Sequence, residues 1–129
     1  MNPTQITESI AKQLEAAWNE MNGEKFAQPF THYSDFINIR GMFLSKGTKE
    51  KITEGHQAIF DSFYKDSKII YEVSDAELLN EHTILAHIKA ELNVPQGPLT
   101  GTHNSIITLV LIQENNEWKI RAFHNTLVK

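Results

Sequence analysis

Residues 83–94 read TILAHIKAELNV, and this stretch decides the fold. Alternate positions from Ile84 onward are apolar, whereas the positions between them include His87, Lys89 and Glu91. A period of two is the signature of a β-strand with one buried face and one solvated face. The sequence therefore predicts a strand over Thr83–Val94.

Three further segments with strand character lie on either side of this one, namely Lys68–Leu79, Thr102–Gln113 and Glu117–Thr126. Hairpin turns are predicted at Asn80-Glu81 and at Asn115-Asn116. Residues 95–98 (PQGP) form a loop, because proline cannot donate a hydrogen bond to a strand ladder. The last half of the chain is therefore predicted to be a β-meander of four long strands.

Helical patterns dominate the part of the chain before the meander. Asn2 is a predicted cap, and Pro3 begins a long amphipathic helix with apolar residues at three- and four-residue steps. These residues are Ile6, Ile10, Leu14, Ala17, Trp18 and Met21. A short helix is predicted over Glu24–Gln28, and a third begins after Thr48. The apolar face of that third helix contains Ile52, His56, Ile59, Phe60 and Phe63.

Between the second and third helices, a strand is predicted over His32–Ile39, with a tight turn at Gly41 and a short partner strand at Met42–Leu44. Helices packed on one face of a curved antiparallel sheet define an α+β fold. The sequence thus predicts one domain, residues 1–129, with about three N-terminal α-helices on a curved antiparallel β-sheet.

The strand over Thr102–Gln113 is apolar on both faces at residues 106–112. Such a strand is covered on both sides in the folded protein. Helices can cover one side, and we expect a second copy of the chain to cover the other. The sequence therefore predicts a homodimer formed through the outer face of the sheet.

Composition narrows the classes of partner. The chain has 129 residues, a net charge of −4 and no cysteine. No basic stripe is present, so nucleic acid is not an expected partner. The longest apolar run, Ile106–Ile112, is too short to cross a membrane, and Met1–Gln5 leads into a helix rather than a signal peptide. We expect a soluble, cytoplasmic protein.

Three phrases of the sequence resemble one known family. They are residues 33–41 (YSDFINIRG), the spacing Ile52…His56…Ile59-Phe60, and residues 118–126 (WKIRAFHNT). With the predicted element order, they resemble the SnoaL-like group, and within it the SgcJ/EcaC-type branch, of the nuclear-transport-factor-two-like superfamily. The resemblance implies a cone-shaped sheet whose open end admits a small apolar molecule. Such folds serve isomerases, cyclases, dehydratases and association domains, so the resemblance fixes no chemistry.

Isomerase-like relatives place a carboxylate base about three residues before the glycine of the first turn. The corresponding residue here is Asn38, counted back from Gly41. An amide cannot accept a proton at neutral pH, but it can orient a carbonyl or a water molecule. The alternative is that Asn38 bonds the backbone of the turn.

Arg40 has the same parity as Phe36 and Asn38, so it is a candidate for anchoring a carboxylate or enolate at a pocket rim. The alternative is an arginine at a strand end that extends into water. Asp35 has the opposite parity, and we expect it to face solvent or to cap a neighbour.

His124 is the strongest catalytic candidate from sequence. Trp118, Ile120, Ala122 and His124 alternate with Lys119, Arg121, Phe123 and Asn125, which places His124 at the end of an apolar face and Asn125 on the outer face. The imidazole pKa lies near neutrality, so this group suits general acid–base chemistry. The alternative is a histidine that only bridges neighbouring groups.

The candidate ligand-binding residues are the aromatic and imidazole groups predicted to line the cone, namely Trp18, Tyr33, Phe36, His56, Phe60, His103 and Trp118. For His56, a buried imidazole bonded to the backbone is the favoured alternative. Tyr33 and Tyr64 could supply hydroxyl donors or simply pack in the core. His103 follows the Pro-Gly loop and is placed near the mouth of the cone.

No metal or cofactor is predicted. The six histidines are dispersed without paired spacing, and the chain has no Gly-rich phosphate loop. Three functions remain open. The first is proton-transfer chemistry on an apolar carbonyl compound, with His124 as acid or base and Asn38 and Arg40 on the oxygen. The second is binding of an apolar ligand without catalysis, and the third is a dimeric association module.

Overall fold

The computed structural model describes residues 1–128 and shows three helices and six strands. In chain order they are α1 (Pro3–Asn19), α2 (Gly23–Ala27), β1 (Phe30–Ile37), β2 (Phe43–Thr48), α3 (Lys49–Phe60), β3 (Lys68–Asn80), β4 (Thr83–Val94), β5 (Gly101–Glu114) and β6 (Glu117–Leu127). The α+β fold predicted from the sequence is confirmed, and the bounds of β4 agree at both ends.

The six strands form a single sheet in the order β2-β1-β6-β5-β4-β3. The meander β3 to β6 is antiparallel, but β1 and β6 run parallel to each other. The expectation of an antiparallel sheet was therefore wrong at this pair, and the sheet is mixed. A parallel pair needs a long crossover, and here β2, α3 and the other meander strands supply it.

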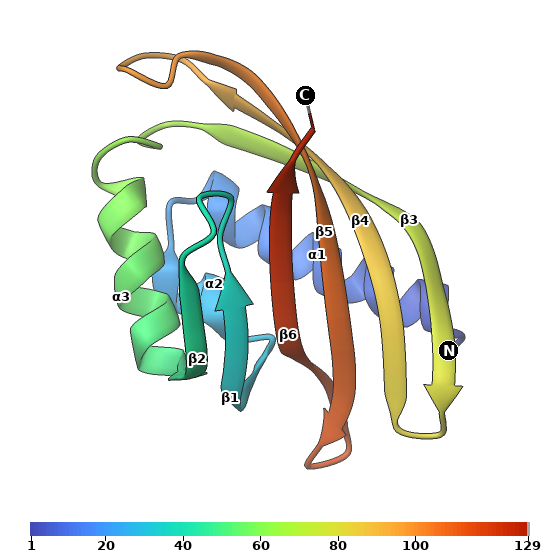
Figure 1. Ribbon diagram of the computed structural model, residues 1–129. Helices are drawn as coiled ribbons and strands as arrows, with labels where there is room; N and C mark the ends of the chain where they lie inside the picture. The colour runs from blue at the N-terminus through green and yellow to red at the C-terminus, as the bar shows by residue number, and fades with distance from the viewer. Residues whose placement is uncertain (129) are drawn as a thin grey trace.

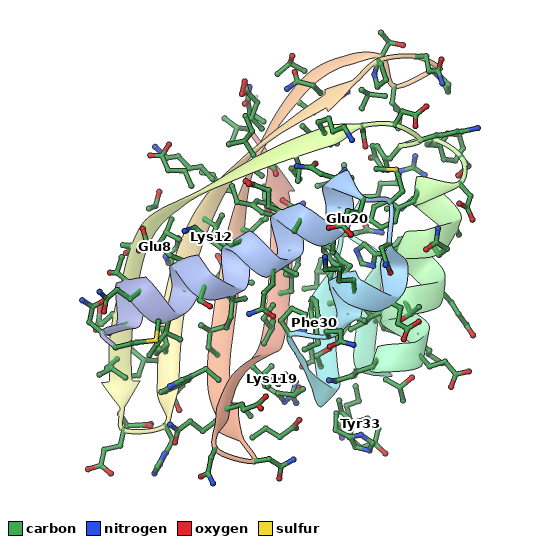
Figure 2. The ribbon with its side chains drawn as sticks, turned by 180° about the vertical axis from the view of Figure 1, so that it is seen from behind. Glu8, Lys12, Glu20, Phe30, Tyr33 and Lys119 are labelled. Carbon is green, nitrogen blue, oxygen red and sulfur yellow. The ribbon has the colours of Figure 1, made fainter. Side chains whose placement is uncertain are left out.

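Helix α1 crosses one face of the sheet, and α2 and α3 continue the helical layer beside β1 and β2 (Figures 1 and 2). Asn2 caps α1 as predicted, since its side chain accepts from the Gln5 N–H at 2.8 Å. The core lies between the two layers, and its largest fully buried side chains include Phe26, Phe30 and Phe60. None of the helices that residues 1–128 form is long and apolar enough to cross a membrane.

The edge strand β3 is held by side chains of α1. The Asn19 amide donates to the Ile69 carbonyl at 3.1 Å and accepts from the Ile69 N–H at 2.7 Å. The Glu15 carboxylate accepts from the Tyr71 N–H at 2.8 Å. These bonds satisfy backbone groups that an edge strand would otherwise leave open.

A β-bulge interrupts β6. Ile120 lies opposite Leu111 on β5, but the next pair joins Ala122 to Val110, so Arg121 is an extra residue. The bulge reverses the alternation. Beyond it Phe123, only 3% exposed, faces the core, whereas His124 is exposed. The expectation that Ala122 and His124 continue the inner face of Trp118 and Ile120 was therefore wrong.

The outer face of the sheet remains partly apolar. Along β5, Ile106 is 43% exposed, and Thr108, Val110 and Ile112 are half-buried. The helices cover only the inner face of this strand, where Ile107, Leu109 and Leu111 are buried.

Candidate functional site

Three connecting segments meet at one end of the sheet. They are the β1–β2 turn, the segment between α3 and β3, and the β4–β5 loop, and Figure 1 shows all three at the upper end. A cleft of about 430 Å³ opens there. Its lining residues are Ser62, Phe63, Lys65, Gln96, Gly97 and Pro98. We call this end of the sheet the mouth.

Asn125 faces inward near the mouth because of the bulge at Arg121. It lies opposite Ile107, a buried residue on the inner face of β5. Its Oδ1 atom is buried, and no group within residues 1–128 donates a hydrogen bond to it. A buried acceptor without a partner costs about 1–3 kcal/mol and calls for a physical explanation. The sequence pattern had placed Asn125 on the outer face, so this residue was missed.

Ser34 Oγ is the other buried side-chain atom that has no partner among the described residues. Ser34 is completely buried in β1, whereas Asn125 is half-buried. Of the two side chains, that of Asn125 is therefore the more accessible.

The segment after α3 is fixed by a chain of hydrogen bonds. The Trp18 indole N–H donates to Ser67 Oγ at 2.9 Å, and the Ser67 hydroxyl donates to the Tyr64 carbonyl at 2.6 Å. The Tyr64 ring lies 5.6 Å from that of Trp18. Trp18 is therefore a core residue that positions one wall of the mouth. Burial raises the pKa of Tyr64, and the positive charge of Arg40 acts in the opposite direction.

His56 is buried in the aromatic core. Its Nδ1–H donates to the Ile52 carbonyl at 2.9 Å, one turn earlier in α3, and its ring stacks on Phe26 with centroids 4.1 Å apart. Burial lowers the pKa of His56 to about 4, although the bond to Ile52 opposes this shift. The imidazole is therefore uncharged at neutral pH. Its hydrogen bond matches the alternative reading of His56, a buried imidazole bonded to the backbone.

Asn38 bonds the backbone of the β1–β2 turn. Its Oδ1 accepts from the N–H groups of Arg40 at 2.9 Å and Met42 at 3.1 Å. The amide oxygen is occupied by the turn rather than directed at a ligand. The Arg40 side chain is exposed, and its guanidinium carbon lies 5.9 Å from the centre of the Phe63 ring. The turn therefore fixes the backbone from which Arg40 reaches the mouth.

Asp35 caps a neighbour, as expected. Its carboxylate accepts from the Lys46 N–H at 2.8 Å and lies 3.3 Å from the Arg121 guanidinium. The bond from Lys46 and the charge of Arg121 hold the pKa of Asp35 below its usual value, against the opposing effect of burial.

The remaining candidate ligand-binding residues lie in different parts of the fold. Phe60 is buried, and Phe36 stacks on Phe123 with centroids 4.4 Å apart. The His103 Nε2–H donates to the Leu99 carbonyl at 2.7 Å, which holds the β4–β5 loop in place. Tyr33 is 51% exposed, so it is not a wall of the core. Figure 2 shows it at the bottom of the view, far from Glu20.

Trp118 lies in a separate hollow of about 270 Å³ between α1 and the start of β6. The hollow is also lined by Ile6, Ile10, Pro29 and Lys119. His124 faces the outer surface, where it pairs with Thr108 on one side and Ile37 on the other. The structure thus separates His124 and Trp118 from Asn38 and Arg40 instead of gathering them in one site. Within residues 1–128, no three histidine or carboxylate side chains gather closely enough to hold a metal ion.

The comparisons with known proteins support the fold. The chain has the cystatin-like fold, also called nuclear-transport-factor-two-like, of several solved structures. A domain of unknown function from Nostoc punctiforme is 27% identical, with a TM-score of 0.85. That similarity covers 99% of this chain and 80% of the other. No family model and no curated protein matches the sequence.

Two more distant neighbours have names that suggest activities. A candidate scytalone dehydratase from Novosphingobium aromaticivorans is 8% identical, covering 97% of this chain and 83% of its own, with a TM-score of 0.79. A ketosteroid isomerase-like protein from Erwinia carotovora is 10% identical, covering 98% and 96%, also with a TM-score of 0.79. At these identities the likeness shows the fold alone.

Proposed function

We propose that this chain is a SnoaL-like small-molecule protein that binds a largely apolar ligand at the mouth. The observation behind the proposal is the buried, unpartnered Oδ1 of Asn125. A ligand hydroxyl or N–H that reaches this atom would recover the hydrogen bond that the empty protein lacks.

Binding is better supported than proton transfer. The amide oxygen of Asn38 accepts a hydrogen bond from the β1–β2 turn, and His56 is buried and bonded to the backbone of α3. His124 is exposed on the outer face of the sheet. Proton-transfer chemistry, to which the names of the dehydratase and isomerase neighbours point, needs a base near the substrate. Burial raises the pKa of Tyr64 although the charge of Arg40 opposes the shift, so the Tyr64 hydroxyl is protonated at neutral pH and can donate a hydrogen bond.

We expect Asn125→Leu to weaken ligand binding and to leave the empty protein as stable as the wild type or more stable. The variant removes an unsatisfied buried acceptor, so about 1–3 kcal/mol of penalty disappears from the folded state. The measurement is a thermal-shift screen with small apolar ketones, phenols and carboxylic acids, in which a ligand of the native state raises the unfolding midpoint.

The matched control is His124→Ala, one residue away on the other face. Compounds that stabilise the wild type should stabilise this control equally and Asn125→Leu less. A screen in which His124→Ala loses the shifts and Asn125→Leu keeps them would refute the site. If the wild type also converts a stabilising ketone or alcohol to a product and Tyr64→Phe does not, the protein is a catalyst as well as a binding protein.

We also infer that a second copy of the chain covers the outer face of the sheet. Ile106, Val110 and Ile112 on β5 give this face an apolar centre, with Leu85 of β4 opposite Val110. Acidic side chains flank it on β3 (Glu72, Asp75 and Glu77), and Lys89 lies on β4. A two-fold arrangement can bring such unlike charges of two copies together.

Light scattering coupled to size exclusion should therefore give the mass of a dimer, and Ile106→Glu should give that of a monomer. A buried carboxylate without a partner opposes association by several kcal/mol. Ala16→Glu, which adds the same carboxylate to the exposed side of α1, should remain dimeric. A monomeric wild-type protein, or a dimer that tolerates Ile106→Glu, would show that this face is not the interface.

A further inference from the structure

We propose that the cleft at the mouth selects small anionic ligands, specifically flat apolar carboxylic acids, through Arg40, which lies against Phe63, and Lys65. This inference rests on the proposed function, because it names the class of ligand that the same mouth accepts. It uses Lys65, which the sequence pattern did not single out, and Phe63, which was predicted on the apolar face of the third helix but lies beyond the end of α3 at Phe60.

The first support is the position of the Arg40 guanidinium. The group lies 5.9 Å from the centre of the Phe63 ring, on a backbone that the Asn38 side chain holds. Its charge reaches the mouth, since it acts on the pKa of Tyr64. A guanidinium placed on an aromatic face keeps its planar donors free for a carboxylate, which it can bind through two parallel hydrogen bonds.

The second support is that the cationic groups here are not neutralised by ion pairs. Among the ion pairs formed within residues 1–128, none includes Arg40 or Lys65. Two carboxyl groups belong to the same segment. Asp61 accepts a hydrogen bond from Gln57 at 3.1 Å, and Asp66 follows Lys65 directly. Within residues 1–128 neither carboxyl group pairs with Arg40 or Lys65, so the side-chain donors of both cations are available to a ligand.

The third support is the shape and chemistry of the cleft. Phe63 is 46% exposed and forms an apolar wall next to the Lys65 side chain. Across the cleft, Gly97 and Pro98 add apolar surface and Gln96 adds an amide. A volume of about 430 Å³ suits a small ring compound. Such a ligand would stack on Phe63 and direct its carboxylate to the cations.

The test uses three probes that share one ring: 4-hydroxyphenylacetate, the neutral 4-hydroxyphenylacetamide and the neutral 4-hydroxyphenethyl alcohol. Dissociation constants are measured by titration of the full chain, for the wild type, Arg40→Gln, Lys65→Gln, Asn125→Leu and the control Lys12→Gln on the far side of α1. We expect the acid to bind at least about tenfold more tightly than the amide, a ratio equal to about 1.4 kcal/mol.

Arg40→Gln should remove this preference for the acid, Lys65→Gln should reduce it, and Lys12→Gln should leave it unchanged. Equal binding of acid and amide by the wild type, or a preference that survives Arg40→Gln, would overturn the inference. If the neutral alcohol binds in an Asn125-dependent manner and the acid does not, the anion selectivity is wrong while the proposed function stands. If no probe binds, both are contradicted.

Discussion

The wild-type protein should lose about 3 kcal/mol of its free energy of unfolding through His56 when the pH is lowered from 7 to 4. The unfolded chain takes up a proton on this imidazole near pH 6.5, whereas the folded protein does so only near pH 4. In this window the unfolded state binds more protons. The stability contributed by the neutral ring is therefore complete above pH 6.5 and is lost as the pH falls toward 4.

The cause of this sensitivity is the packing around the ring. Phe26 stacks on the imidazole, and the edge of Phe36 lies against it with centroids 5.1 Å apart. The hydrogen bond to Ile52 uses Nδ1–H, which both protonation states possess. The aromatic neighbours carry no negative group to balance the positive charge that a second proton brings. Protonation of the ring therefore has the free-energy cost of burying an ion.

Urea unfolding of the wild type and His56→Phe at several pH values measures the effect. Carboxyl groups titrate in the same range in both proteins, so the difference between the two isolates His56. That difference should fall by about 3 kcal/mol between pH 7 and pH 4. His82→Gln, at an exposed loop position, should follow the wild type at every pH. Parallel curves for the wild type and His56→Phe would show that the ring is not buried as described.

Gly23→Ala should destabilise the protein by about 3 kcal/mol, because α2 meets α3 at this residue without room for a methyl group. A Cβ atom at position 23 would lie 2.6 Å from the Thr53 carbonyl oxygen and 2.9 Å from the Gln57 backbone nitrogen. Both are backbone atoms of a helix and cannot move aside singly. The Gly23 N–H also donates to the Gln57 side chain at 2.8 Å, a bond that separation of the helices would lengthen.

Gly55→Ala is the matched control on the same helix. Position 55 is exposed in the interior of α3, and a Cβ atom there meets nothing within 4 Å. Alanine has the higher helix propensity, so this variant should gain up to about 1 kcal/mol. Denaturant unfolding of the two variants should thus give changes of opposite sign. Equal stability of Gly23→Ala and the wild type would contradict the close contact of the two helices.

The sequence predicts α1 and β4 well because each has a strong local signal. Asn2 with Gln5 fixes the start of α1, and the alternation of residues 83–94 fixes β4. The parallel pairing of β1 with β6 has no such signal, since it joins residues such as Phe36 and Phe123 that are distant in the chain. Local patterns define strands, but long-range packing chooses their partners.

The candidate site was harder to predict, and the bulge at Arg121 is the main reason. No glycine marks it, and the alternation of residues 118–124 reads as continuous. One clue was available: uninterrupted alternation buries Ala122 and exposes the much larger Phe123, which is the less favourable choice. Shifting the register after Arg121 buries Phe123 and brings Asn125 inside. Arg40 was placed at the rim from parity alone. Phe63 was assigned to the apolar face of the third helix, but α3 ends at Phe60, so Phe63 and Lys65 lie in the segment that follows it.

The anchoring of β3 by α1 has a consequence for how copies of this chain can associate. Asn19 and Glu15 already occupy the N–H and carbonyl of Ile69 and the N–H of Tyr71, which hinders docking of another strand along that part of the sheet edge. Ordered self-association by adding strand to strand, as in amyloid growth, is thereby hindered where β3 begins. Loss of the Asn19 side chain would expose backbone groups at the edge of β3, to which another strand could bind, without removing any residue from the core.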